Sequence, residues 1–300
     1  MKILLLGKNG QVGEMLQAAL SPLGAVVAWG REDACLENPL RLAGAVAALE
    51  ADIIVNAAAY TAVDKAESEP ATAFLVNAEA VSALAGVARR QGAWLVHYST
   101  DYVFDGRKSD AYTEEDQPNP LCVYGRSKLA GDRAIVASGC QYLIFRVSWV
   151  YAAGHANFPR AMLRLARERT SLNVVADQVG APTSARLVAD VTAKALATLA
   201  QDRSGVNWSG IYNVAAAGAT SKADMVRFIL AEAAALGCQT TLAPDEVWPV
   251  KTQMFPTPAT RPLNSRLNTT KLRRTFSMDL PPWQEDMRQW VAQELAEVAA

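Results

Sequence analysis

Tyr124 and Lys128 stand four residues apart in the segment Cys122-Val-Tyr-Gly-Arg-Ser-Lys128. On a helix this spacing brings the ammonium one turn from the phenol. Tyrosine has a pKa of about 10, and a nearby positive charge lowers that value. We therefore expect Tyr124 to donate a proton to a carbonyl oxygen while a hydride reaches the carbonyl carbon. Taken alone, the same spacing is also typical of an exposed aromatic–lysine contact.

A glycine-rich segment near the N-terminus predicts where a hydride donor would bind. The apolar run Ile3–Leu6 leads into Gly7-Lys-Asn-Gly10-Gln-Val-Gly13. This pattern is typical of a strand, a tight turn and the start of a helix, whose N–H groups face a pyrophosphate. We expect a dinucleotide to contact Gly7, Gly10, Gln11, Val12 and Gly13. A purely structural turn is the alternative.

The end of the second predicted strand, Ala25–Trp29, favours one coenzyme. NAD sites usually carry a carboxylate there, whereas this strand is followed by Gly30 and Arg31. A guanidinium can bind a 2′-phosphate with two hydrogen bonds. Arg31 therefore favours NADPH, although Asp33 lies close enough to keep NADH open.

Composition excludes several classes of protein. The 300 residues are 51% hydrophobic and 20% charged, with a net charge of -1, which predicts a soluble globular protein and gives no reason to expect nucleic acid or a membrane as partner. No signal peptide or continuous membrane-spanning run is evident. Four widely spaced cysteines are typical of reduced thiols in a cytoplasmic protein, and two histidines make a zinc site a poor expectation.

Short apolar runs alternate with longer helical patterns in the first half of the chain, which predicts a parallel sheet of the α/β, Rossmann-type doubly wound class. The expected strands are Lys2–Leu6, Ala25–Trp29, Ile53–Asn56, Trp94–Tyr98 and Tyr142–Arg146. The expected helices are Gln11–Leu20, Leu40–Leu49, Pro70–Arg90 and Tyr124–Ala137.

The pattern loosens after residue 150. Helical periodicity continues at Phe158–Arg169, Ala185–Leu199, Lys222–Leu236 and Trp283–Val298, with shorter strands at Leu172–Val175 and Ile211–Val214. We therefore expect a dinucleotide-binding domain over residues 1–150. Residues 151–300 are expected to form mainly a smaller α/β substrate-binding lobe, with some segments returning to the sheet.

These motifs resemble those of the extended short-chain dehydrogenase/reductases. The resemblance rests on the glycine turn, Asn56-Ala-Ala-Ala59, Tyr98-Ser-Thr-Asp-Tyr-Val-Phe104 and the Tyr124–Lys128 pair. More specific segments are Asn56–Glu67, Phe145–Tyr151, Asp177–Thr183 and Arg261–Leu267, which are similar to members acting on a dTDP-linked keto sugar. That resemblance implies NADPH-dependent reduction of the C4 ketone of dTDP-4-dehydro-6-deoxy-L-mannose to dTDP-L-rhamnose.

The resemblance also implies roles for individual residues. Tyr124 would be the proton donor, Lys128 would tune it and bind the nicotinamide ribose, and Thr100 would bond the carbonyl oxygen. The coenzyme would further contact Ala57, Ala58, Ala59, Tyr60, Thr61 and Tyr98. The substrate would contact Thr100, Asp101, Trp149, Gln178, Ala181, Pro182, Thr183, Arg261 and Asn264. We expect Asp64, Lys65 and Glu67 to form an ion-paired helix start.

Two departures from the family narrow the expectation. Related dehydratases follow the threonine with Asp-Glu, but here Asp101 is followed by Tyr102, so no base for eliminating water is evident. Some relatives hold Mg²⁺ through glutamates at a dimer contact, where this chain has Met15 and Arg186. Glu14 and Asp190 are close by in sequence but suit the role poorly. We expect no metal-bridged dimer, although a homodimer remains possible and Mg²⁺ could accompany the diphosphate.

Two other functions remain open. Non-catalytic NADP-binding relatives act as regulatory subunits of methionine adenosyltransferase, although the intact Thr100–Tyr124–Lys128 set speaks against that role here. A reductase or epimerase of another nucleotide sugar is the second alternative.

Overall fold

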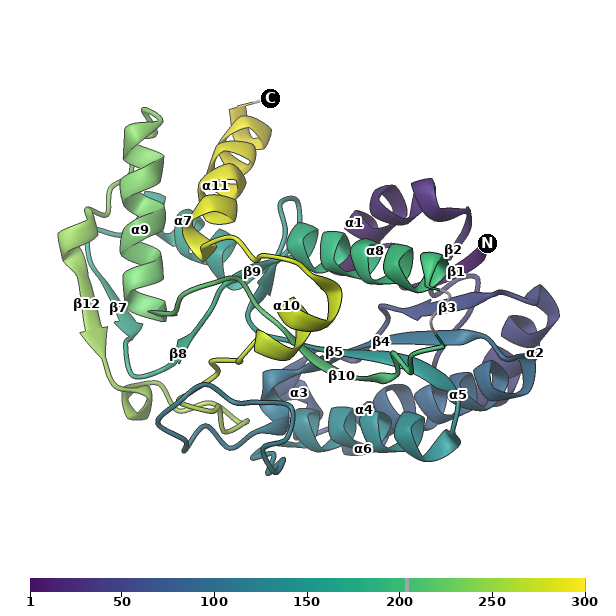
Figure 1. Ribbon diagram of the computed structural model, residues 1–300. Coiled ribbons are helices and arrows are strands. Elements are labelled where there is room, and N and C mark those ends of the chain that lie inside the picture. The colour runs from purple at the N-terminus through teal and green to yellow at the C-terminus, as the bar shows by residue number, and fades with distance from the viewer. Residues whose placement is uncertain (203–204, 300) are drawn as a thin grey trace.

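Six parallel strands form the central sheet in the order β10-β5-β4-β3-β1-β2 (Figure 1). We describe residues 1–202 and 205–299 from a computed structural model. The strands are β1 Lys2–Leu6, β2 Ala25–Trp29, β3 Ile53–Asn56, β4 Trp94–Thr100, β5 Gln141–Val147 and β10 Gly210–Val214. The predicted doubly wound fold is confirmed. The first three strands match their predicted bounds, while β4 and β5 extend one or two residues further.

Helices cover both faces of this sheet because its strands are apolar on both sides. Ile3 and Leu5 pack into one core with α1 (Gln11–Leu20) and α8 (Ala185–Gln201). Leu4 and Leu6 point the other way and pack with the opposite helices. Those helices are α2 (Pro39–Leu49), α5 (Ala80–Gln91) and, at the end of the same layer, α6 (Val123–Ser138) (Figure 1).

The predicted helix Pro70–Arg90 contains a break in its hydrogen-bond pattern. It consists of α4 (Pro70–Phe74), a π turn over Leu75–Glu79, and α5. The whole stretch is apolar and long enough to cross a bilayer by composition, but half of its most apolar window is buried inside the protein. The π turn brings Asn77 inward, where its side chain bonds the backbone of Tyr60 and the hydroxyl of Ser127.

A smaller core lies beside the main sheet, on the left in Figure 1. It is built from α7 (Phe158–Glu168), β7 (Leu172–Val175), α9 (Lys222–Ala235) and β12 (Val247–Val250). Strand β12 was not predicted, because Pro249 interrupts its sequence pattern and is tolerated on this edge strand. Strand β10 and helix α8 return to the main sheet, while the domain division at residue 150 stays a prediction.

The remaining elements complete the described structure. The remaining strands are β6 Val150–Tyr151, β8 Val179–Gly180, β9 Thr183–Ser184 and β11 Thr220–Ser221. The remaining α-helices are α3 Val63–Ala66, α10 Thr270–Phe276 and α11 Trp283–Ala299. Single 3₁₀ turns occupy Ser21–Leu23, Asp101–Val103, Pro244–Glu246 and Thr252–Met254.

Candidate active site

A cavity of about 590 Å³ opens at the carboxyl ends of the central strands. This is the edge at which open α/β sheets bind ligands. Its lining includes Gly7, Gly10, Gln11, Val12, Arg31, Ala57, Ala58, Ala59, Thr61, Tyr98, Tyr124 and Lys128. The structure therefore brings most of the predicted coenzyme residues to one site.

The glycine turn is shaped by close backbone contacts. Gly7 has a φ of +86°, and a Cβ added there would lie 2.7 Å from the Ala58 nitrogen. A Cβ at Gly13 would lie 2.0 Å from the Gly7 carbonyl oxygen. Gly13 thus lets α1 pack closely against the turn at Gly7. The N-terminus of α1 faces the cavity and can bind a phosphate.

Arg31 lines the cavity, whereas the neighbouring carboxylates are held elsewhere. Asp33 accepts hydrogen bonds from the Gly30 N–H and the Lys8 ammonium, both at 2.8 Å. Glu32 pairs with the same ammonium at 3.0 Å. The bond from Lys8 holds the pKa of Asp33 below its usual value. Arg31 and Glu37 both line this part of the cavity, whereas Glu32 and Asp33 are held by Lys8.

Tyr60 lies outside the cavity lining, unlike its neighbours in the loop after β3. Its backbone N–H donates to Asn77 at 2.9 Å, and its hydroxyl donates to Glu69 at 2.9 Å. The predicted coenzyme contact of Tyr60 therefore finds no support in its position. The residue instead ties the loop to the π turn.

Tyr124 is positioned by the first turn of α6. Glu67 accepts a hydrogen bond from the Val123 N–H at 2.7 Å and so caps this helix from α3. The Tyr124 ring packs edge-to-face against Tyr102, with ring centroids 5.6 Å apart. The Thr100 hydroxyl, at the end of β4, lies close enough to the phenol to favour its ionised form, although its own proton is donated to Asp101. The residues of the predicted catalytic set therefore converge.

Lys128 is not among the groups that shift the Tyr124 pKa here, so the predicted lowering of that pKa by Lys128 stays a prediction. Burial raises the pKa of Tyr124, and the bond with Thr100 only partly opposes it. The Lys128 Nζ lies 3.0 Å from His97 Nε2, and burial lowers the pKa of Lys128 to about 8. The lysine is thus turned to His97, and the phenol keeps its proton at neutral pH, which is the form able to donate.

Asp101 is a buried carboxyl beside the reacting groups. It is 3% exposed, and its Oδ1 lies 3.2 Å from the Thr100 hydroxyl. Its Oδ2 has no hydrogen-bond partner among the residues that the structure describes. Burial raises the pKa of Asp101 to about 6, against the hydrogen bonds of Ser265 and Thr100 and the charge of Lys222.

Replacing Asp101 by asparagine is expected to stabilise the fold at pH 7.5 by roughly 1–3 kcal/mol. The folded protein holds this proton more tightly than the unfolded chain, whose pKa is 3.8, so stability falls as pH rises from there through about 6. Urea unfolding at pH 4 and pH 7.5 measures the difference. The gain should shrink at pH 4, and the exposed control Asp245→Asn should show neither effect. Destabilisation at pH 7.5 would contradict the burial argument.

Trp149 is held in an unusual backbone conformation with a φ of +46°. A Cβ added at Gly180 would lie 2.7 Å from the indole Cε2, so only glycine leaves room for the ring. The Lys222 ammonium lies 5.4 Å from the indole centroid and 5.0 Å from that of Phe158. The predicted sugar-contacting tryptophan therefore has a built and strained position.

The predicted substrate segment after β7 is buried. Gln178, Ala181, Pro182 and Thr183 all lie below the surface. The Gln178 amide donates to Thr252, and the Thr183 hydroxyl donates to the Ala181 carbonyl while accepting from the Ala216 N–H. These hydrogen bonds give the residues a structural role, and their direct contact with substrate stays a prediction.

The predicted diphosphate contacts are already engaged within the protein. Arg261 pairs with Asp64 through two bonds of 2.8 and 3.1 Å. The Asn264 amide donates to the carbonyls of Lys108 and Asp110 and accepts from Arg266, so it ties two loops together. A structural task is shown for both residues, and binding of diphosphate by Arg261 stays a prediction. The predicted ion-paired set of Asp64, Lys65 and Glu67 does not form, because Asp64 pairs with Arg261, Lys65 pairs with Glu69 at 2.8 Å, and Glu67 accepts the Val123 N–H.

The residues at the family's metal position do not suit Mg²⁺. Met15 and Arg186 line a small cavity of about 130 Å³ between α1, α8 and α11. Glu14 instead bonds His155 at 2.6 Å, and Asp190 lies 3.9 Å from Arg186. Within residues 1–202 and 205–299, no group of three or more His, Cys, Asp or Glu side chains is placed to hold a metal.

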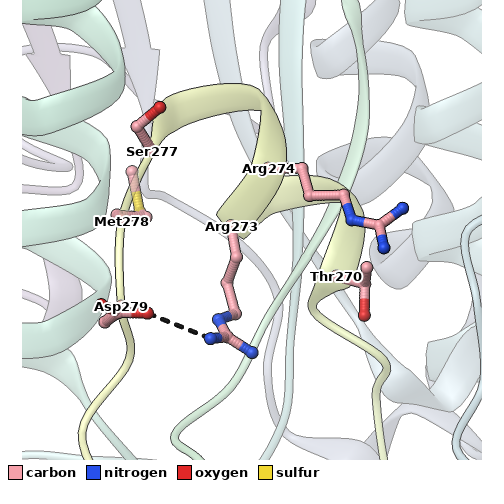
Figure 2. Close-up of a pocket in the computed structure, with 6 residues that line it drawn as sticks. All are labelled: Thr270, Arg273, Arg274, Ser277, Met278 and Asp279. Carbon is pink, nitrogen blue, oxygen red and sulfur yellow. Dashed lines mark hydrogen bonds and ion pairs between the residues drawn. The ribbon is translucent and has the colours of Figure 1, made fainter.

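A second hollow, of about 500 Å³, lies on the surface beside α10 (Figure 2). Arg273 there pairs with Asp279 at 3.0 Å, and Arg274 points away from that pair. The hollow contains none of the predicted site residues. The chemistry therefore belongs to the cavity at the sheet edge.

Three residues of the site escaped sequence reasoning. His97 contacts Lys128, Glu67 caps the catalytic helix, and Lys222 stands over Trp149. Only His97 carried a usable signal, as a histidine in an apolar strand two residues before Ser99. The other two are brought to the site by contacts between distant segments.

Comparison with known proteins gives a consistent family. The family model described as "RmlD substrate binding domain" matches residues 1–296. A dTDP-4-dehydrorhamnose reductase of Burkholderia thailandensis is 48% identical over 284 residues, covering 94% of this chain and 95% of that protein. The Salmonella typhimurium protein of the same name is 49% identical over 288 residues, covering 95% of each.

Solved structures agree. A Bacillus anthracis dTDP-4-dehydrorhamnose reductase in complex with NADP has a TM-score of 0.87 at 30% identity, covering 97% of this chain and 99% of that one. A Clostridium acetobutylicum structure of the same name has a TM-score of 0.87 at 31% identity, covering 99% of this chain and 100% of that one.

Proposed function

The chain belongs to the family of dTDP-4-dehydrorhamnose reductases, and from that premise we propose that it reduces the C4 ketone of dTDP-4-dehydro-6-deoxy-L-mannose to dTDP-L-rhamnose with NADPH. One observation carries the proposal. The Tyr124 and Lys128 side chains line the same cavity as the glycine turn and Arg31, and Thr100 lies next to Tyr124. Reduction of a ketone needs a proton donor and a coenzyme site within one enclosed space.

Coenzyme binding is assigned to the α1 side of the cavity. The N-terminus of α1 offers N–H groups to the pyrophosphate, and the small side chains of Ala57, Ala58 and Ala59 let the backbone lie close to the coenzyme. Bound NADPH supplies the hydride that reduces the carbonyl carbon. Lys128 reaches the same space from α6 and is placed to bond ribose hydroxyls.

The proton steps belong to three side chains. Tyr124 donates its phenolic proton to the carbonyl oxygen as charge develops there. The Thr100 hydroxyl has one proton, which can bond either Asp101 or the substrate oxygen. Lys128 in its ammonium form stabilises the phenolate that Tyr124 leaves behind. Tyr124 and Thr100 act on the carbonyl oxygen, and Lys128 acts on Tyr124.

We assign the sugar to the neighbourhood of Asp101, Trp149 and Lys222, because the Lys222 charge acts on Asp101 and its ammonium lies 5.4 Å from the Trp149 ring centroid. The unpartnered Oδ2 of Asp101 can accept a hydrogen bond from a sugar hydroxyl, which would satisfy a buried polar atom. The indole of Trp149 can cover the apolar face of a deoxysugar. The dTDP-linked sugar is the substrate class that this set suits best.

An assay with purified protein tests the function. NADPH absorbance should fall when dTDP-4-dehydro-6-deoxy-L-mannose is added, with dTDP-L-rhamnose as the product. The UDP and GDP analogues should react much more slowly. Equal turnover of all three would point to another nucleotide-sugar reductase, and no turnover of any, with NADPH bound, would reject the proposal.

Arg31→Ala is expected to raise the KM for NADPH by about 10- to 100-fold, because a charged hydrogen bond to the 2′-phosphate is lost. The KM for NADH, which lacks that phosphate, should hardly change. Steady-state kinetics with both coenzymes measures the ratio, and Arg41→Ala, an exposed arginine on α2, is the matched control. A parallel rise in both KM values would show that Arg31 does not read the phosphate.

A further inference from the structure

Three buried polar side chains, Asn56, His97 and Lys128, form a hydrogen-bonded network next to the cavity. Their exposures are 1%, 0% and 1%. His97 sits in β4 with its Nε2 3.0 Å from the Lys128 Nζ and its Nδ1 3.2 Å from the Asn56 Nδ2. The Asn56 Oδ1 accepts the Ala58 N–H at 3.2 Å. This network thus links Lys128 to the loop that lines the cavity.

The hydrogen-bond directions in this network determine which nitrogen of His97 carries the proton and whether Lys128 is charged. Asn56 turns its oxygen to Ala58 and therefore its NH₂ to His97, so His97 Nδ1 accepts. A neutral imidazole that accepts at Nδ1 carries its proton on Nε2. That N–H points at the Lys128 nitrogen, and only a neutral amine has a lone pair to accept it.

If Lys128 is an ammonium, the donor and acceptor roles in every hydrogen bond of this network must be exchanged. An ammonium donates to Nε2, which moves the imidazole proton to Nδ1. Asn56 must then turn its oxygen towards His97, and its bond with the Ala58 N–H is lost. Going from ammonium to amine, Nζ passes a proton to Nε2 and Nδ1 releases one, so a single proton leaves to water.

The surrounding charges permit both states. On α6, Tyr124 and Asp132 flank the lysine, and Asp132 favours the ammonium. That carboxylate is shared with Ser99 of β4 at 2.7 Å and with Arg146 of β5 at 3.6 Å, which limits its effect on Lys128. Burial disfavours the ammonium and also keeps the pKa of His97 well below its ordinary value, so a doubly charged pair is excluded.

We propose that His97 is a positioning residue for Lys128, and that Asn56, His97 and Lys128 form a proton-linked switch in which the charge of the lysine sets the imidazole tautomer and the bonding of the Ala58 N–H. Its meaning for the reaction rests on the proposed function. The ammonium state would support the Tyr124 phenolate and release the Ala58 N–H in the coenzyme loop. The switch itself is a property of the protein alone.

Nitrogen-15 NMR of labelled histidine tests the switch without substrate or coenzyme. The chain has two histidines, so His155→Asn identifies the His97 signals. Between pH 6.5 and 9.5 the protonated nitrogen should change from Nδ1 to Nε2, with a midpoint near the Lys128 pKa of about 8. A single tautomer throughout, or an imidazolium, would overturn the proposal.

Lys128→Met and a matched control complete the test. Without the amine, His97 should hold its proton on Nε2 at every pH, because Asn56 still donates to Nδ1. Lys194→Met, at an exposed lysine of α8, should switch as the unaltered protein does. A tautomer change that persists in Lys128→Met would overturn the proposal, and the titration of the unaltered protein decides if that variant does not fold. A failed reductase assay would leave this result unaffected.

Discussion

Replacing Tyr124 by phenylalanine is expected to lower kcat for keto-sugar reduction by about 10²- to 10⁴-fold, the usual contribution of a positioned general acid. The phenol is protonated at neutral pH because burial raises its pKa, and the Thr100 hydroxyl lies beside it. Phenylalanine keeps the edge-to-face packing on Tyr102 and removes only the transferable proton. Steady-state turnover, beside thermal unfolding and NADPH titration, measures the effect.

Tyr142→Phe is the matched control, since Tyr142 lies near the amino end of β5 and does not line the cavity. It should leave turnover unchanged. NADPH affinity and unfolding temperature should be near normal in both variants, so that the lost activity reports the chemical step. Full activity in Tyr124→Phe would remove Tyr124 from the role of acid.

Gly13→Ala is expected to weaken NADPH binding by about 10- to 100-fold and to destabilise the fold by about 1–3 kcal/mol. Its new methyl group would lie 2.0 Å from the Gly7 carbonyl oxygen, a separation that real structures essentially never show. The obstacle is backbone, so the turn itself must move. Because this turn presents the α1 N–H groups to the pyrophosphate, coenzyme titration and urea unfolding should both register the change.

Gly44→Ala provides the matched control in α2, where an added methyl group meets nothing within 4 Å. Alanine suits a helix interior better than glycine, so this variant should gain about 0.5–1 kcal/mol of stability and bind NADPH normally. Normal coenzyme affinity in Gly13→Ala would show that the turn has more freedom than its contacts indicate.

The sequence predicted the sheet well because each buried strand is a continuous apolar run with a clear end. Lys2–Leu6 stops at a glycine and Ile53–Asn56 at a polar residue, and both match the structure. Periodicity failed inside Pro70–Arg90, where one extra residue per turn makes the π turn at Leu75–Glu79 without any change in composition. Strand β12 was missed for the opposite reason. Pro249 disfavours a strand in the local sequence, but pairing with β7 forms one nevertheless.

The site shows the same division between local and distant effects. The glycine turn and the Tyr124–Lys128 spacing are local, and the structure places them in the cavity as expected. The contact of Lys128 with His97 could not be predicted from the sequence, because it depends on the packing of β4 against α6. Likewise, Arg261 meets Asp64 only because distant segments of the chain are folded together. Charges on a sequence do not reveal which opposite charge they will meet.

The left-handed backbone at Trp149 has a consequence for the engineering of this protein. A φ of +46° at a bulky residue costs roughly 1–2 kcal/mol, an appreciable part of the 5–15 kcal/mol by which a folded protein is usually stable. Glycine at this position would relieve the strain but would remove the indole that is proposed to cover the sugar. We therefore expect substitutions at residue 149 to exchange stability against activity.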